Sequence, residues 1–288
     1  MKPPSAATAV GLLCAVSCGL AAAACPLSAL PYELLWSGDV ADWSRTGRGA
    51  LYQFGAENLS QGPAGLRASY PKGSYDPAAV RTAGAPLGGA QFRTPFSGMK
   101  LAAASEAGVR YQLLLQDNFD FVRGGKLPGL YGGAANTGGR VPTGSDGFSV
   151  RFVWQAQGLG ALSAYLPSSG KWGSVFGLGH WRFTPGRVTN LALYVKLNVP
   201  GSANGVIAAW ADDVLVVYAP DVVFRHVAEL VVDGFLFSTF FGGSTPDWAT
   251  PVDTASQYGP MEIFRLDPTA LVRCAAGDGN LGTRREVR

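Results

Sequence analysis

The chain is poor in charged residues, histidine and cysteine. Charged side chains make up 15% of its 288 residues, and there are 2 histidines and 4 cysteines. Histidine and cysteine are the usual zinc ligands, and these few residues form no zinc-binding pattern in the sequence. We expect neither a metal nor a cofactor. The net charge of +3, with no Lys/Arg-rich block, argues against nucleic acid as a partner. The sequence also lacks a Gly-x-Ser-x-Gly elbow and a phosphate-binding loop.

Helix-period patterns are scarce after the first 25 residues, whereas glycine is abundant, with 39 residues. Short strand-like segments recur between turns instead, without the spacing of βαβ units. We expect an all-β jelly-roll sandwich of two antiparallel sheets, forming a single domain over residues 25–276. The clearest strand-like segments are 109–115, 148–154, 206–210, 214–218, 230–241 and 261–266. The Gly/Pro/Ala-rich stretch 55–95 is expected to form extended loops.

The first 24 residues have the features of a secretory signal peptide. Lys2 precedes an apolar run from Ala6 to Ala24, and the run ends in small residues that suit signal peptidase. We expect residues 1–24 to be removed and the protein to be secreted, without stable insertion in a membrane. The tail 277–288 is expected to be disordered.

Two cysteines remain after removal of the signal peptide, Cys25 and Cys274, one near each end. Chain termini often lie close together, so a disulfide between them is expected in an oxidising compartment. A second interpretation stays open, because Ala-Ala-Ala-Cys25 loosely resembles a bacterial lipoprotein cleavage site. In that case Cys25 would carry a lipid.

Lys126 lies in an unusual setting, Asn118-Phe-Asp-Phe-Val-Arg-Gly-Gly-Lys-Leu-Pro-Gly-Leu-Tyr-Gly-Gly133. The many glycines let the backbone approach another molecule closely. A cation in such a segment suits an anion, and on a sugar-binding sheet that anion would be a uronate carboxylate. The alternative is an ordinary solvated lysine in a glycine-rich bend.

The segment 148–154 alternates strictly. Phe148, Val150, Phe152 and Trp154 share one face, so Ser149 and Arg151 project from the other.

Four segments in the same order resemble the polysaccharide lyase family 14 domain. They are Gly124-Gly-Lys-Leu-Pro-Gly-Leu-Tyr-Gly-Gly133, Phe148-Ser-Val-Arg151, Tyr194-Val-Lys-Leu-Asn-Val-Pro-Gly201 and Phe237-Ser-Thr-Phe-Phe-Gly-Gly243. That family includes alginate and glucuronate-polymer lyases. The resemblance implies a jelly roll with a concave substrate cleft and cleavage of 4-linked uronates by β-elimination.

Such a lyase removes the proton at C5 of a uronate, which is barely acidic while the neighbouring carboxylate stays charged. A cation must neutralise the carboxylate, a base must take the proton, and an acid must protonate the departing O4. Lys126 matches the family's functional lysine. Ser149 and Arg151 match a Ser-x-Arg pair that projects into the cleft, where an arginine can hold a carboxylate.

The family also has a Tyr-x-Tyr pair, and here the chain departs from the pattern. Tyr165 keeps the second tyrosine, whereas Ser163 replaces the first. Residues two apart on a strand share a face, so both phenols can serve one sugar in the family. Here Tyr165 alone is expected to act as the proton-transfer residue.

Further candidate binding residues follow from residue type and surroundings. His180 could supply the missing base, because imidazole titrates near neutral pH. Tyr131, Trp172 and Trp181 are flanked by glycines and could stack on sugar rings.

We therefore expect a monomeric secreted lyase that acts on an acidic polysaccharide. Two alternatives stay open on the same fold: a carbohydrate-binding module without activity, and a glycoside hydrolase with two opposed carboxylates.

Overall fold

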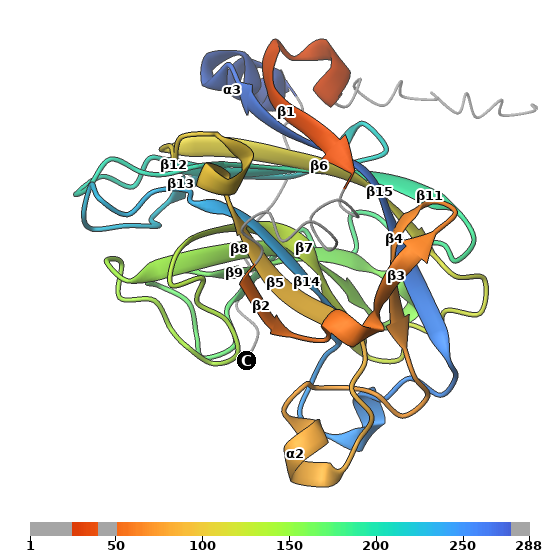
Figure 1. Cartoon of the computed structure of the whole chain (residues 1–288). Coiled ribbons are helices and arrows are strands. Elements are labelled where there is room, and N and C mark those ends of the chain that lie inside the picture. The colour runs from red at the N-terminus through yellow and green to blue at the C-terminus, as the bar shows by residue number, and fades with distance from the viewer. Residues whose placement is uncertain (1–24, 40–50, 278–288) are drawn as a thin grey trace, which may run out of the picture.

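A computed structural model describes residues 25–39 and 51–277. Two antiparallel sheets lie face to face, with the first above the second in Figure 1. The expected signal peptide and nearly all of the expected tail lie outside the described residues, although Gly277 ends a helix.

The first sheet has eight strands. In spatial order they are β13 (Val214–Val222), β12 (Gly205–Ala211), β11 (Val188–Lys196), β6 (Glu106–Leu115), β15 (Thr254–Leu266), β4 (Gly65–Tyr70) and β3 (Leu59–Gly62), and β1 (Tyr32–Asp39) also pairs with β15.

The second sheet has seven strands. In spatial order they are β10 (Ser174–Phe176), β9 (Gly160–Tyr165), β8 (Gly147–Gln155), β7 (Gly124–Gly133), β14 (Gly234–Phe241), β5 (Ala90–Pro95) and β2 (Leu51–Phe54).

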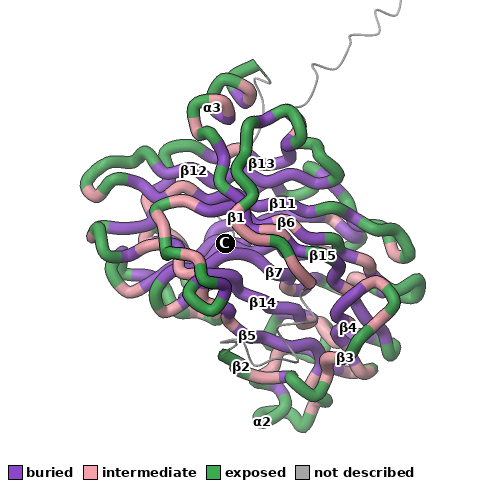
Figure 2. Tube along the Cα trace, turned by 45° about the horizontal axis from the view of Figure 1, so that its top comes forward, coloured by how far each residue is buried: buried purple, intermediate pink, exposed green. Residues whose placement is uncertain are grey.

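The main hydrophobic core lies between the two sheets, where Figure 2 shows the strands buried and the connections exposed. Alternation along each strand creates this core. In β8, Phe148, Val150, Phe152 and Trp154 are fully buried in it, as the sequence pattern predicts. The all-β sandwich of two antiparallel sheets is confirmed.

The outer face of the first sheet is covered by the two ends of the described chain. A short 3-10 helix, η1 (Leu27–Ala29), and the C-terminal helix α3 (Pro268–Gly277) pack there in a second apolar cluster. Figure 1 shows α3 on the outer side of this sheet. The sequence analysis missed α3.

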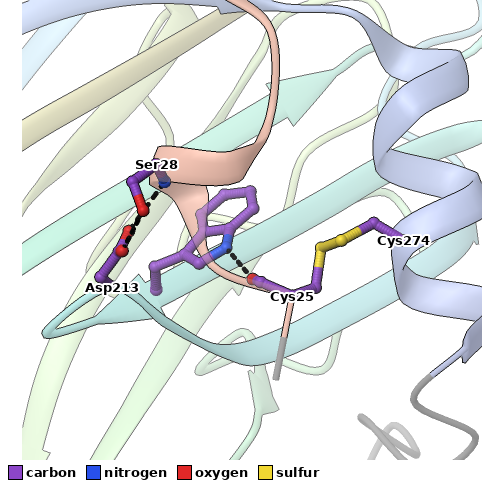
Figure 3. Close-up of a disulfide and its surroundings, with 5 residues drawn as sticks. Cys25, Ser28, Asp213 and Cys274 are labelled. Atoms are coloured by element: carbon purple, nitrogen blue, oxygen red, sulfur yellow. Dashed lines mark hydrogen bonds between the residues drawn. A yellow bond between two sulfur atoms is a disulfide. The ribbon is translucent and has the colours of Figure 1, made fainter. Parts of the chain in front are cut away.

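A disulfide joins these two elements, because Cys25 is bonded to Cys274 at a Cα–Cα distance of 5.5 Å (Figure 3). Two further contacts hold the N-terminal segment to the sheet. The Trp210 indole N–H donates to the Cys25 carbonyl at 3.0 Å, and the Ser28 backbone N–H donates to Asp213 at 2.9 Å. The two ends of the described chain are therefore fixed to the outer face of the first sheet.

The expected loop region 55–95 is wrong in part. It contains β3, β4, β5 and the short helix α2 (Ala79–Ala83). In β5 the alternation of Ala90, Phe92 and Thr94 with two polar residues follows the pleat, but the surrounding glycine and proline conceal it. The strand-like segment 230–241 is interrupted by Gly234 in the sequence, and the strand β14 begins at that glycine.

The other expected strands are confirmed, and β12 and β13 form an antiparallel hairpin. Asp212 and Asp213 form its turn with φ of 49° and 68°, a conformation that suits Asp at a tight hairpin turn. In the described part of the chain, no helix has the length and apolar character needed to cross a membrane.

We predict that replacing both cysteines, Cys25→Ser with Cys274→Ser, lowers the free energy of unfolding by about 2–5 kcal/mol. The bond closes a loop with a sequence separation of 249, and its loss frees both ends in the unfolded chain. Denaturant titration of the mature protein measures the change. Adding reductant to the wild type should reproduce it, and equal stability of wild type and variant would contradict it.

Candidate active site

The outer face of the second sheet brings the sequence-predicted polar residues together. Ser149 and Arg151 of β8 project from it, opposite the core residues of the same strand. Across the ladder to β9, Ser149 faces Tyr165 and Arg151 faces Ser163. Across the ladder to β7, Ser149 faces Tyr131. Residues that oppose each other share a face, so these five side chains form one patch.

Lys126 joins this patch because β7 contains a register shift. Between Lys126 and Gly129, three steps along β7 span two along β8, from Val153 to Arg151. One extra residue reverses which side chains point outward. Leu127 therefore turns into the core, and Lys126 lies on the same face as Arg151. Pro128 lies inside the shift, where a strand tolerates a residue without an N–H.

A tyrosine of the opposite sheet contacts this bulge from the core side. The hydroxyl of Tyr111, on β6, donates to the Pro128 carbonyl at 3.1 Å, across the core. Tyr111 is buried, and burial raises the pKa of its phenol well above the usual value. The bulge carbonyl thus keeps a neutral hydrogen-bond donor.

Arg151 reaches across β7 to the next strand. Its guanidinium Nη1 donates to Ser238 Oγ on β14 at 2.9 Å, and Ser238 donates to Gln91 Oε1 on β5 at 2.7 Å. The side chain crosses β7 where the ladder places Gly129 opposite it. A Cβ on Gly129 would overlap the Val150 carbonyl oxygen, so glycine is required at this close approach.

Arg151 and Lys126 are two basic residues that lack an acidic partner among the described residues. Arg151 is 1% exposed, and within the same residues its Nε has no hydrogen-bond partner. Burial lowers the pKa of Arg151 to about 10. Burial, then repulsion from Arg151, lowers the pKa of Lys126 to about 7. Lys126 keeps some exposed surface, but protein surrounds it on most sides and removes much of the water from its ammonium group.

Within the described residues, no carboxylate forms an ion pair with either cation. Buried charges are normally paired, because removing them from water is costly. This part of the sheet therefore has the electrostatics of an anion site.

Tyr165 lies at the end of the patch. Its hydroxyl oxygen accepts the Gly139 backbone N–H at 3.3 Å, and the residue is a diagonal neighbour of Arg151 across the β8–β9 ladder. Ser149 donates to the Asn136 carbonyl at 2.6 Å, so its hydroxyl is engaged by the same loop. Ser163 is 2% exposed and lies on the same face as Tyr165, as the spacing predicts.

Tyr131 lies beside a second arginine that sequence reasoning missed. The Arg93 guanidinium is 5.8 Å from the Tyr131 ring centroid. Burial raises the pKa of Tyr131 to about 12, an increase that Arg93 opposes. Arg93 and Gln91 lie in the stretch interpreted as loop. The alternation of Gln91 and Arg93 with apolar residues was the signal that could have found them.

Two predicted site residues lie elsewhere. Trp181 is 8% exposed and packs edge-on against Phe152 and Phe183 in the core, so the expected sugar platform is wrong at this position. His180 is exposed, and its Nδ1 is 2.8 Å from the Val216 carbonyl on the first sheet. A carbonyl only accepts, so Nδ1 carries the proton, and the imidazole has no contact with Tyr165.

Trp172 is 62% exposed and lies in a loop beside Gly139.

Two hollows in the surface lie away from the patch. The larger, about 470 Å³, is on the outer face of the first sheet and includes Arg110, Trp210 and Glu262 among its walls. The other, about 350 Å³, lies between the loop after β9 and the end of β13. Neither is lined by Lys126 or Arg151. Within the described ranges there is no cluster of three His, Cys, Asp or Glu that could hold a metal.

The family model of polysaccharide lyase 14 matches residues 58–261, which include every residue of the patch. The chain belongs to this family. It is a lyase, and its relatives act on uronate polysaccharides. No curated protein matches the chain.

Solved structures agree with the family. The marine alginate lyase of Aplysia kurodai is 26% identical, with a TM-score of 0.69 over 80% of this chain and 98% of that one. An alginate lyase from Chlorella virus is 18% identical, with a TM-score of 0.62 over 80% and 99% of the two chains. A variant of the alginate lyase Aly36B, in complex with an alginate trisaccharide, is 19% identical, with a TM-score of 0.65 over 83% and 94%. The last two show the shared fold.

We predict that Tyr111→Phe lowers the free energy of unfolding by about 1–2 kcal/mol, because the Pro128 carbonyl loses its buried donor. Lyase activity of the folded variant should fall about tenfold, since the bulge then holds Lys126 less firmly. Denaturant titration and steady-state kinetics measure the two effects.

Tyr258→Phe is the matched control, because its hydroxyl is buried in the same core but bonds to Thr239. It should lose stability and keep its kcat. Equal kcat in both variants would refute the role assigned to the bulge contact.

Proposed function

We propose that the protein is a secreted lyase that cleaves alginate by β-elimination, with Lys126 and Arg151 engaging the uronate carboxylate and Tyr165 transferring protons. The observation behind this proposal is the pair of cations without an acidic partner on one sheet face. A polymer with one carboxylate per sugar supplies the missing negative charge.

The bonds change as follows. The base takes the proton from C5, the electrons of that C–H bond form a C4=C5 double bond, and the C4–O4 bond breaks. The departing O4 receives a proton, so the products are a new chain end and an unsaturated uronate. Neutralising the carboxylate stabilises the negative charge that develops at C5 and on the carboxylate in the transition state.

Each group has a position that suits its role. Lys126 and Arg93 keep some exposed surface, so an incoming anion meets these cations first. Arg151 offers an unpartnered Nε N–H on the same face. Tyr165 is a diagonal neighbour of Arg151 across the β8–β9 ladder and also receives the Gly139 N–H. The phenol is thus held beside the arginine that would engage the carboxylate, a position that suits a proton-transfer group.

Alginate is the favoured substrate because alginate is named for the three solved relatives described above. Glucuronan has the same 4-linked carboxylate chemistry and is the alternative that the experiment must separate.

Export fits the chemistry of the cysteines. A disulfide between Cys25 and Cys274 persists in an oxidising compartment. It also uses the sulfur that a lipid on Cys25 would need. We therefore favour a secreted protein over a lipid-anchored one.

Ser163 is the feature that favours a second function, a module that binds acidic polysaccharide without cleaving it. It occupies the position of the family's first tyrosine, and the described contacts place no histidine near it. A serine hydroxyl without an adjacent base cannot take the proton from C5.

We predict that incubation with alginate raises ultraviolet absorbance, because the new double bond is conjugated to the carboxylate. Lys126→Ala and Tyr165→Phe should each reduce the initial rate by about a hundredfold or more, with folding intact. Mannuronate-rich and guluronate-rich alginate and glucuronan, assayed in parallel, identify the substrate. Full activity in both variants would disprove the assigned roles. If the folded wild type gives no absorbance change on any of these polymers, the binding module is the better assignment.

We predict that substrate binding depends on pH. In the inactive Tyr165→Phe variant, affinity for an alginate oligosaccharide should weaken as the pH rises above about 7. The pKa of Lys126 is about 7, so the ammonium loses its charge there while the sugar carboxylate stays ionised. Isothermal titration calorimetry between pH 6 and pH 9 measures this.

Adding Lys126→Arg should make the affinity independent of pH across the same range, because a guanidinium stays charged. Binding that strengthens above pH 7 would mean that Lys126 acts as the neutral amine, and thus as a base.

A further inference from the structure

An exposed tryptophan lies at the end of the active-site patch. Trp172 is 62% exposed, the highest value among the large apolar side chains that the structure describes as exposed. It belongs to none of the apolar clusters, so packing does not explain it. It lies in the loop that joins β9 to β10, a few residues after Tyr165.

This loop touches the loop that bonds to Tyr165. A Cβ built on Gly139 would lie 3.4 Å from Trp172 Cζ3 and 3.5 Å from Lys171 Cε. The same Gly139 donates its N–H to the Tyr165 hydroxyl. Gly139 therefore neighbours both the indole and the proposed proton-transfer group, and the indole is largely exposed to solvent.

Lys171 adds a cation to this surface. Its Nζ is 5.0 Å from the centroid of the Trp172 ring, and the side chain is exposed. Over residues 25–39 and 51–277, no ion pair involves Lys171. An aromatic ring with an adjacent unpaired ammonium suits a sugar that has an apolar C–H face and a carboxylate.

We propose that Trp172 and Lys171 form a distal subsite for another uronate of the same polymer, outside the reacting position. The indole stacks on the C–H face of the pyranose, and Lys171 moves from the ring to the carboxylate of that sugar. This inference rests on the proposed function, because it takes the polymer to be the lyase's own substrate. The subsite holds the chain in place and takes no part in the chemical step.

The test compares kcat/KM on alginate oligosaccharides of increasing length, from the shortest that the wild type cleaves. Trp172→Ala should lower kcat/KM on long substrates by about three- to tenfold and leave the shortest substrate unchanged. Trp172→Phe should retain most of the effect of the ring. Lys171→Ala should give a similar length-dependent loss, and Lys171→Arg should restore it.

The salt dependence of kcat/KM distinguishes the charge contribution of Lys171 from the stacking contribution of Trp172. The loss in Lys171→Ala should disappear near 1 M NaCl, where the wild type loses the same charge contact. The loss in Trp172→Ala should persist. Lys72→Ala removes an exposed lysine from another loop and serves as the control for net charge, with no dependence on substrate length expected.

An equal loss on short and long substrates would overturn the subsite, because it would mean that the loops only position Tyr165. No loss on any substrate would overturn it as well. If the wild type cleaves no uronate polymer, the proposed function fails by itself. Retardation in alginate-containing gels then decides the subsite, and unchanged retardation of Trp172→Ala relative to the wild type would refute it.

Discussion

The register shift in β7 is the constraint on which the active site depends. Without it, strict alternation would turn Lys126 into the core and place Leu127 beside Arg151. One additional residue in β7 reverses the faces to which Lys126 and Leu127 point. Pro128, which has no N–H, lies within this shift, outside the paired positions of the ladder. The core stabilises this irregular geometry through Tyr111, which comes from the other sheet. The interior of the sandwich thus sets the position of a functional group on its outside.

The outer faces of the two sheets have different roles, one in stability and the other in binding. The first sheet's outer face is covered by η1 and α3 and contributes a second apolar cluster. The second sheet's outer face holds cations that lack acidic partners within residues 25–39 and 51–277, an arrangement that is costly for stability and useful for binding an anion. Stability from core, cluster and disulfide lets the protein keep this unfavourable charge arrangement. The lowered pKa of Lys126 shows that its charged form is destabilised by burial and by the nearby Arg151.

Much of this was predictable from the sequence, for identifiable reasons. The alternation over 148–154 placed Ser149 and Arg151 on the outward face, and the family resemblance identified Lys126 and Tyr165. The alternation rule alone could not place Lys126, because a bulge changes parity without leaving a pattern in residue types. Arg93 and Gln91 were missed because glycine and proline surround their short strand. Trp181 was misjudged because flanking glycines indicate neither face of a sheet, and His180 because its partner, Val216, is remote in sequence.

The place of β15 has a consequence for how the chain is made. This strand, near the end of the sequence, pairs with β1, β4 and β6 and so lies inside the first sheet. The first sheet is therefore incomplete until β15 has been synthesised, and the disulfide forms only after Cys274, which follows β15, has been made. Contacts of such long sequence separation form slowly. A chain cut short before β15 would lack the strand that joins β1, β4 and β6 into one sheet, so these earlier strands depend on a later one to complete their ladders.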